Sequence, residues 1–113
     1  MKINIIIVSI FALLTACTST TGVIHKPPRV TSAESAVDVR IHNVISSGKV
    51  TFTINDVEIY GFIEPSHYDF VLDAGSYMFG YKKGSSKCYA EVMLNTGNAY
   101  VFNLAPDCVI EMQ

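Results

Sequence analysis

The stretch that decides the fold reads Val50-Thr51-Phe52-Thr53-Ile54-Asn55-Asp56-Val57-Glu58-Ile59-Tyr60-Gly61-Phe62. From residue 50 to residue 55 apolar and polar side chains alternate, which is the period-two pattern of a strand with one buried face. Asn55-Asp56 is typical of a tight turn, because Asn and Asp tolerate turn conformations. A second, mostly apolar segment, 57–62, follows directly, so the stretch predicts two strands joined by a short turn.

The same alternation extends on both sides of this stretch. Clusters of Gly, Ser, Asn and Pro interrupt it at short intervals, and no convincing amphipathic helix occurs. The predicted strands cover residues 37–42, 50–55, 57–62, 68–72, 77–81, 88–94, 99–104 and 108–112. Because many short strands at close spacing indicate an all-β fold, we expect a small antiparallel β-sandwich or barrel of about seven to eight short strands.

Asn95-Thr96-Gly97-Asn98 is a strong hairpin signal, because Gly and Asn tolerate positive φ. We expect strands 88–94 and 99–104 to pair across this turn. In that hairpin Cys88 lies opposite Ala105, and Cys108 follows just past the turn at Pro106.

The first residues of the chain have the pattern of a secretory signal. Lys2 precedes a mostly apolar run, 3–14, which is followed by small residues. This run is too short to cross a bilayer as a helix, because a spanning helix needs about 20 residues. We therefore leave residues 1–16 out of the predicted fold.

Leu14-Thr15-Ala16-Cys17 resembles the lipobox of bacterial lipoproteins. The resemblance implies cleavage between Ala16 and Cys17, a diacylglycerol on the Cys17 sulfur and usually an acylated new amine. Two or more acyl chains make a stable membrane anchor. The family's inner-membrane retention signal is Asp in the next position, where this chain has Thr18, so the resemblance implies the outer membrane of a Gram-negative source. The alternative is an ordinary signal peptide with Cys17 as a chance residue.

The rest of the chain divides into two parts. Residues 17–35 are rich in Thr, Ser, Gly and Pro and lack apolar periodicity, so we expect the lipidated Cys17 to continue into a flexible tether. Residues 36–113 form the predicted β domain. A chain of 113 residues has room for one domain of this kind.

Cys88 and Cys108 remain once Cys17 is assigned to the lipid. In a chain exported to an oxidising compartment we expect these two cysteines to form a disulfide. A disulfide that closes a loop of this length contributes about 3 kcal/mol to stability. The alternative is a pair of free thiols in a redox or metal site, although the sequence contains no Cys-x-x-Cys motif.

The charge of the chain argues against nucleic acid as a partner. Without Lys2 the chain has 7 basic and 10 acidic residues, a net charge of about −3 before the new terminus is counted. A nucleic-acid-binding domain needs a basic face. The same net charge does not suggest electrostatic attachment to anionic lipid, so the acyl chains alone are expected to hold the protein on the membrane.

The residues with catalytic potential do not form a recognisable motif. His25, His42 and His67 show no metal-ligand spacing, and we expect neither a metal nor another cofactor. The carboxylates that are dense around the middle strands fit turn caps and soluble surfaces better than an acid–base pair. No Ser elbow, phosphate loop or Cys/His nucleophile stands out, so we expect that the protein is not an enzyme.

Tyr and Phe side chains crowd the predicted strands, and most of them fit a sandwich core. Tyr60, Tyr68 and Tyr89 fall near strand ends, where a position on the rim is possible. Because Tyr is enriched at interface hot spots, these three residues are the candidates for binding a partner, with burial in the core as the alternative.

Residues 50–81 resemble the small β-sandwich modules of the PEGA and transthyretin-like type. The resemblance lies in Glu64-Pro65 at a strand end and in Leu72-Asp73-Ala74-Gly75-Ser76-Tyr77 at the entry to the next strand. The chain departs from that pattern because no Pro-Glu-Gly-Ala string is present. The resemblance implies a binding or structural module rather than an enzyme.

Three functions follow from these patterns. The first is a lipid-anchored, non-catalytic interaction or structural module that holds an envelope protein near the membrane, as secretion-machine lipoproteins with transthyretin-like domains do. The second is a periplasmic inhibitor or protective lipoprotein, such as those that block lysozymes. The third is a small-ligand carrier or an enzyme that uses the mouth of the sandwich.

Overall fold

The computed structural model describes residues 21–113, so the predicted signal peptide, Ala16 and Cys17 lie outside the described residues. The elements are β1 (Gly22–Val23), the 3₁₀ helix η1 (Ala33–Ser35), β2 (Ala36–Asn43), β3 (Val50–Ile54), β4 (Val57–Phe62), β5 (Ser66–Asp73), β6 (Gly75–Lys83), β7 (Ser86–Leu94), β8 (Ala99–Ala105) and β9 (Val109–Met112). Each of the eight predicted strands corresponds to one of the strands from β2 to β9.

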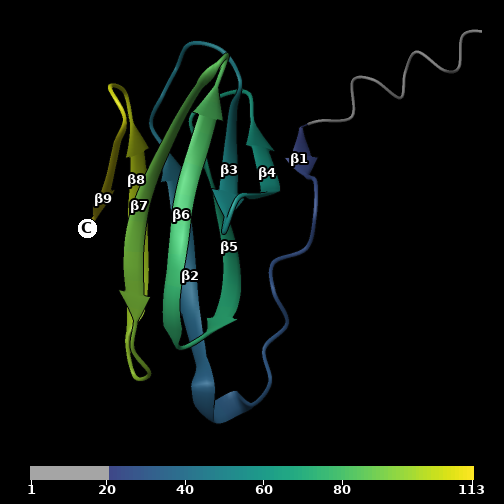
Figure 1. Cartoon of the computed structure of the whole chain (residues 1–113), viewed down its shortest axis with the longest axis vertical. Helices are drawn as coiled ribbons and strands as arrows, with labels where there is room; N and C mark the ends of the chain where they lie inside the picture. Colours follow the sequence, from purple (N-terminus) through teal and green to yellow (C-terminus); the bar gives the residue numbers. More distant parts are fainter. Residues whose placement is uncertain (1–20) are drawn as a thin grey trace, which may run out of the picture.

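The strands form two sheets that pack face to face (Figure 1). Sheet A has the strand order β1-β4-β3-β6-β7, and sheet B has the order β5-β2-β8-β9. Both sheets are open, so the structure confirms the all-β class and selects the sandwich from the two predicted architectures.

Three connections are hairpins within one sheet: β3–β4, β6–β7 and β8–β9. The predicted hairpin between residues 88–94 and 99–104 is wrong, because β7 belongs to sheet A and β8 to sheet B. The loop Asn95–Asn98 therefore crosses between the sheets, which lie about 10 Å apart in such folds. A local turn signal cannot show which sheet receives the second strand, because that choice depends on distant strands.

One pair of strands departs from the antiparallel expectation. β2 pairs in parallel with β8 over six residue pairs, from Asp38↔Ala99 to Asn43↔Leu104. These strands are far apart in the sequence, and both run toward the same end of the sandwich (Figure 1). The other strand pairs in both sheets are antiparallel.

The deciding stretch forms the hairpin β3–β4, as predicted. Asn55 and Asp56 adopt φ of 50° and 69°, the left-handed region that a two-residue hairpin turn requires at both positions. The Asn55 backbone N–H donates to Met78 O at 2.8 Å, and its side-chain oxygen accepts from Met78 N at 2.8 Å. The turn therefore also joins the neighbouring strand β6.

The core lies between the two sheets. Alternate residues of each strand point inward, and the largest fully buried side chains include Phe52, Phe62, Phe79, Ile41 and Leu72. The Phe52 and Phe79 rings meet edge to face at 5.2 Å, and Phe79 meets Phe102 at 5.1 Å. The first contact joins two strands of sheet A, and the second joins sheet A to sheet B at the centre of the sandwich.

Part of the segment predicted as a flexible tether makes backbone hydrogen bonds to the sandwich. Gly22 and Val23 pair with β4, and Ile24 N donates to Ile59 O at 2.8 Å. Further along, Thr31 N donates to Asp73 Oδ1 at 3.0 Å. The free edge of β4 offers backbone groups that need partners, and the segment contacts the domain at residues 22–25 and again at Thr31 and Ser35.

Candidate functional site

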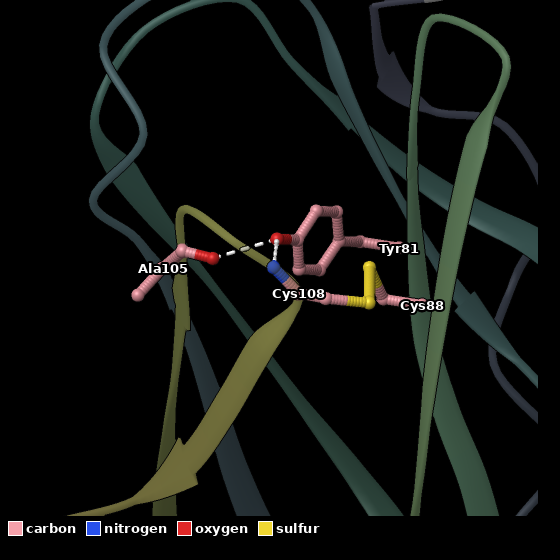
Figure 2. The surroundings of a disulfide bond; sticks show 4 residues. All are labelled: Tyr81, Cys88, Ala105 and Cys108. Atoms are coloured by element: carbon pink, nitrogen blue, oxygen red, sulfur yellow. Dashed lines mark hydrogen bonds between the residues drawn. A yellow bond between two sulfur atoms is a disulfide. The ribbon is translucent and has the colours of Figure 1, made fainter.

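Cys88 and Cys108 form the expected disulfide, with their Cα atoms 5.3 Å apart (Figure 2). Cys88 lies on β7 at the edge of sheet A, and Cys108 lies in the β8–β9 turn at the edge of sheet B. The pairing is confirmed, but it does not arise from a β7–β8 hairpin. The bond instead closes the gap between the two sheets at one side of the sandwich.

Tyr81 on β6 holds the same turn from the interior. Its side chain is only 3% exposed. Its hydroxyl donates to Ala105 O at 2.6 Å and accepts from Cys108 N at 3.0 Å (Figure 2). Asp107 and Cys108 adopt φ of 67° and 65°, an uncommon conformation for residues other than Gly. The hydroxyl and the disulfide together hold the backbone in this strained turn.

A hollow of about 650 Å³ opens beside this turn. Tyr81 and both cysteines form its apolar part, while Lys83, Lys87 and Asp107 bring charges to its rim. The loop that joins β2 to β3 closes another side with serine hydroxyls. The hollow is open to solvent, and the amines and hydroxyls among its lining residues can donate hydrogen bonds to an anion.

Tyr60 and Tyr68, two candidates for binding a partner, lie against each other. Tyr60 comes from β4 in sheet A and Tyr68 from β5 in sheet B, and their rings stack at 4.2 Å with an angle of 16°. Both side chains are half-buried and pack against the core. Burial, and secondarily Tyr60, raises the pKa of Tyr68. The structure therefore places this pair between the sheets.

Tyr89, the third candidate, lies on the outer face of sheet A and is 45% exposed. It faces Gly80 across the β6–β7 pair, and its hydroxyl donates to Asp56 Oδ1 at 2.9 Å. A Cβ atom at Gly80 would lie 2.8 Å from Tyr89 Cδ1 and 2.8 Å from Thr53 Oγ1. The Tyr89 ring thus covers the glycine and the buried Thr53, while its other face meets solvent.

Tyr89 belongs to a group of exposed side chains around Glu91 that the sequence did not reveal. Met78 is 41% exposed and Met93 59% exposed on the same outer face of sheet A. Met78 pairs with Glu91, the residue midway between Tyr89 and Met93 on β7. Such diagonal neighbours lie within reach of long side chains. We call Met78, Tyr89 and Met93 the methionine patch.

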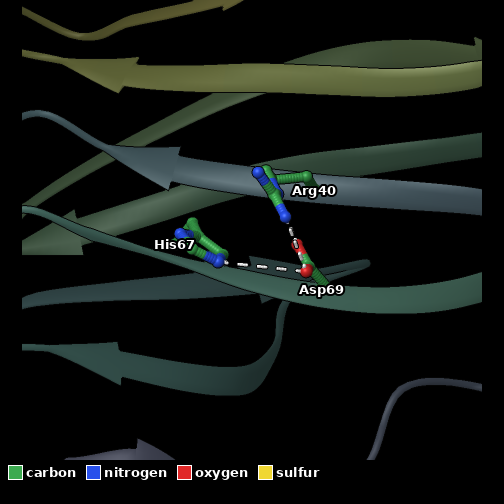
Figure 3. Close-up of polar contacts among 3 residues, drawn as sticks. All are labelled: Arg40, His67 and Asp69. Carbon is green, nitrogen blue, oxygen red and sulfur yellow. Dashed lines mark hydrogen bonds and ion pairs between the residues drawn. The ribbon is translucent and has the colours of Figure 1, made fainter.

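The outer face of sheet B carries a different group of side chains (Figure 3). Arg40 on β2 donates to Asp69 on β5 through Nε at 2.7 Å and Nη2 at 3.0 Å. His67 Nε2 lies 3.9 Å from Asp69 Oδ2. The hydrogen bond from Arg40 lowers the pKa of Asp69. Both partners of the Arg40–Asp69 pair are about half exposed, so it contributes little to stability.

The histidines occupy places that the sequence did not reveal. His42 and His67 face each other across the β2–β5 pair, and His25 Nδ1 lies 2.9 Å from Glu58 O. Among residues 21–113 no group of three or more His, Cys, Asp or Glu side chains is arranged to hold a metal ion. The part of the chain that the structure describes also contains no helix long and apolar enough to span a membrane.

No protein-family model matches the chain, and no curated protein matches it. The fold places the described residues in the class of two-sheet β-sandwiches with one disulfide between the sheets. Because one such sandwich can serve many functions, the function of this protein depends on particular residues and not on its fold alone.

Proposed function

We propose that the protein is a lipid-anchored cell-envelope lipoprotein and acts as a non-catalytic interaction or structural module. The observation that carries this proposal is Leu14-Thr15-Ala16-Cys17 directly after the apolar run of a signal sequence. The disulfide supports export, because disulfides persist in oxidising compartments. The proposed location is the outer membrane, with the domain facing the periplasm or the cell surface.

The methionine patch supports a protein as the partner. Met side chains adapt their shape to different surfaces, and Tyr supplies rigid contact area. Among the three tyrosines selected from the sequence, Tyr89 keeps nearly half of its surface exposed, whereas Tyr60 and Tyr68 stack on each other. We therefore place the contact with the envelope partner on the outer face of sheet A.

Lipidation is tested by palmitate labelling of cells that express the protein. The wild-type chain incorporates label, and Cys17→Ala leaves an unlabelled precursor or soluble form. Thr18→Asp is the matched control, because it changes only the neighbouring residue and keeps the sulfur that accepts the lipid. Label that persists in Cys17→Ala would refute the anchor.

The partner surface is tested by photo-crosslinking in living cells, followed by mass spectrometry. A photoreactive residue in place of Met93 samples the methionine patch, and one in place of Val71 samples the outer face of sheet B as a control. We expect one stoichiometric protein adduct from position 93 and none from position 71. Equal adducts from both positions, or none from either, would contradict the proposed surface.

A further inference from the structure

The lysines of the domain gather at one end of the sandwich. Lys49 immediately precedes β3, whereas Lys83 and Lys87 flank the turn between β6 and β7. Lys83 reaches over the β2–β3 loop, since a Cβ atom at Gly48 would lie 3.7 Å from its Nζ. We call Lys49, Lys83 and Lys87 the lysine end.

These three amines have no acidic partner in an ion pair within residues 21–113. The nearby Lys82 differs, because it pairs with Glu58. Two carboxylates at this end offset part of the lysine charge. Asp107 lines the same hollow as Lys83 and Lys87. Exposed Glu64 follows β4, whose last residue pairs with Val50 next to Lys49. The net charge of the chain is negative, yet this end exposes more positive than negative groups.

The opposite end of the sandwich carries acidic side chains. Glu34 lies in η1, and Asp73 and Asp38 lie where β5 ends and β2 begins. The charges are therefore separated along the strands. An anionic surface attracts the lysine end and repels the other one.

β1, the first strand that the structure describes, lies in one row with residues of the lysine end. Gly22 pairs with Gly61, Gly61 with Thr51, Thr51 with Lys82 and Lys82 with Lys87, so these residues form one row across sheet A. Because β1 is antiparallel to β4, Thr21 precedes Gly22 on the side of Val50, toward the end where the β6–β7 turn lies (Figure 1).

Only residues 18–21 separate Cys17 from Gly22. Five residue steps span at most roughly 18 Å even when fully extended. If Cys17 carries lipid in the membrane, the Cα atom of Gly22 therefore lies at most roughly 18 Å from the Cα atom of the anchored Cys17. The row crosses four strand spacings, so Lys87 at its far end lies roughly 19 Å from Gly22 and no farther than roughly 37 Å from Cys17.

We propose that the lysine end docks onto anionic lipid headgroups of the membrane that holds Cys17. This inference rests on the proposed function, because the anchor sets the distance. Each lysine near an anionic surface strengthens attachment about fivefold. Docking orients the sandwich with its strands steep to the membrane and leaves the methionine patch facing sideways.

The test attaches the chain to vesicles without relying on cellular lipidation. The mature chain, beginning at Cys17 and with its Cys88–Cys108 disulfide formed, is coupled through the Cys17 thiol to a maleimide lipid. The vesicles contain either phosphatidylcholine alone or phosphatidylcholine with phosphatidylglycerol. A water-soluble acylating reagent then modifies the lysines, and mass spectrometry gives the rate at each one.

We expect Lys49, Lys83 and Lys87 to react about fivefold more slowly on anionic than on neutral vesicles, the effect of one lysine at such a surface. Lys26 is the internal control and reacts equally on both. The difference disappears at 1 M salt, where the Debye length is about 3 Å. Equal rates on both vesicles at the lysine end, or equal slowing at Lys26, would overturn the inference.

Two charge-matched variants give an independent result. Lys83→Gln/Lys87→Gln abolishes the slowing at Lys49, whereas Lys26→Gln/Arg29→Gln preserves it. Slowing by inorganic phosphate on neutral vesicles would overturn docking in favour of a free-anion site. If palmitate labels the protein in cells but the acylation of the lysine end is not slowed on anionic vesicles, this inference alone is overturned. Slowing on vesicles without palmitate labelling in cells overturns the proposed lipoprotein function instead.

Discussion

At the scale of single residues, tyrosine hydroxyls hold loops in place. Tyr77 donates to Asp73 O at 2.7 Å, and Tyr100 accepts from Asn95 N at 3.0 Å. Tyr81 makes two such bonds, to Ala105 O and from Cys108 N. Each of these tyrosines thus has a buried or half-buried ring in the sandwich and a hydroxyl on a connection between strands. The alternation pattern places the rings correctly but says nothing of the hydroxyls.

Tyr81→Phe tests the value of the most buried hydroxyl. The substitution keeps the ring but leaves Ala105 O and Cys108 N without this partner, which costs about 1–3 kcal/mol. Urea unfolding measures the loss as a lower midpoint with an unchanged slope. Tyr89→Phe is the control, because its hydroxyl bonds Asp56 at an exposed position and we expect a smaller loss. A loss from Tyr89→Phe that equals the one from Tyr81→Phe would contradict this role.

At the scale of elements, the edges of the sheets explain where the N-terminal segment lies. β1 covers the edge of β4 near one end of the sandwich, and Asp73 holds the segment near the other. Asp73 accepts from Ser35 Oγ at 2.6 Å and from Thr31 Oγ1 at 3.1 Å. The sequence showed only a Pro-containing polar stretch. The two residues of β1 and the hydrogen bonds to Asp73 are too few to leave a periodic pattern along the chain.

The attachment at Asp73 predicts a dependence on pH. The hydrogen bond from Ser35, and then the one from the Thr31 backbone, lowers the pKa of Asp73. A carboxyl group with a lowered pKa stabilises the folded state above its unfolded pKa of about 3.9, and this contribution is lost as the pH falls through the folded value. We therefore expect the attachment of residues 31–35 to weaken as the pH falls below about 3.9 and through the lower folded value.

NMR-detected exchange of the Thr31 amide measures this detachment. We compare the exchange rate with the intrinsic rate of an unprotected amide at the same pH. Wild-type protein protects the Thr31 amide at neutral pH and loses this protection in acid, whereas Asp73→Asn shows little protection at either pH. Asp38→Asn is the control, because this carboxylate lies at the same end but the Thr31 amide does not bond to it. The same acid response in wild type and Asp73→Asn would refute the role of this carboxylate.

At the scale of the whole molecule, the disulfide joins β7, an edge strand of sheet A, to the β8–β9 turn of sheet B. In residues 21–113 the two sheets share no strand pairing, so the bond is a covalent link between them. Cys88 and Cys108 are separated by 20 residues, so the bond contributes about 3 kcal/mol in the chain-entropy account. A small domain buries a limited core and depends on such a contribution. The bond also keeps the lysine end and the β8–β9 turn in one arrangement.

The double variant Cys88→Ala/Cys108→Ala tests this contribution. We expect a loss of about 3 kcal/mol in urea unfolding, the value for a closed loop of this length. Wild-type protein measured with a reducing agent should match the variant, which separates loss of the bond from loss of the side chains. In a Cys17→Ala background, denatured and unreduced protein should show no reactive thiol. Two reactive thiols would contradict the disulfide in the native protein.

The candidate site was only partly accessible from the sequence. The cysteine pair followed from their number and from the predicted export. Tyr89 was selected for a position near a strand end, whereas β7 begins at Ser86 and places it within the strand, and its binding role stays a prediction. The methionine patch and the lysine end did not follow, because each joins residues from different strands or loops. For the lysine end, the local signals were the lysines crowded into 82–87 and the serine-glycine loop before Lys49.

The sequence by itself determined the strands, the β3–β4 turn, the disulfide partners and the predicted lipidation at Cys17. These features depend on neighbouring residues, whose periodicity, turn preference and chemistry can be read along the chain. Only the tertiary structure decided which sheet each strand joins, why β2 runs parallel to β8, and where the free lysines collect. Those outcomes depend on the burial of inward side chains between two sheets, a collective condition to which distant parts of the chain contribute together.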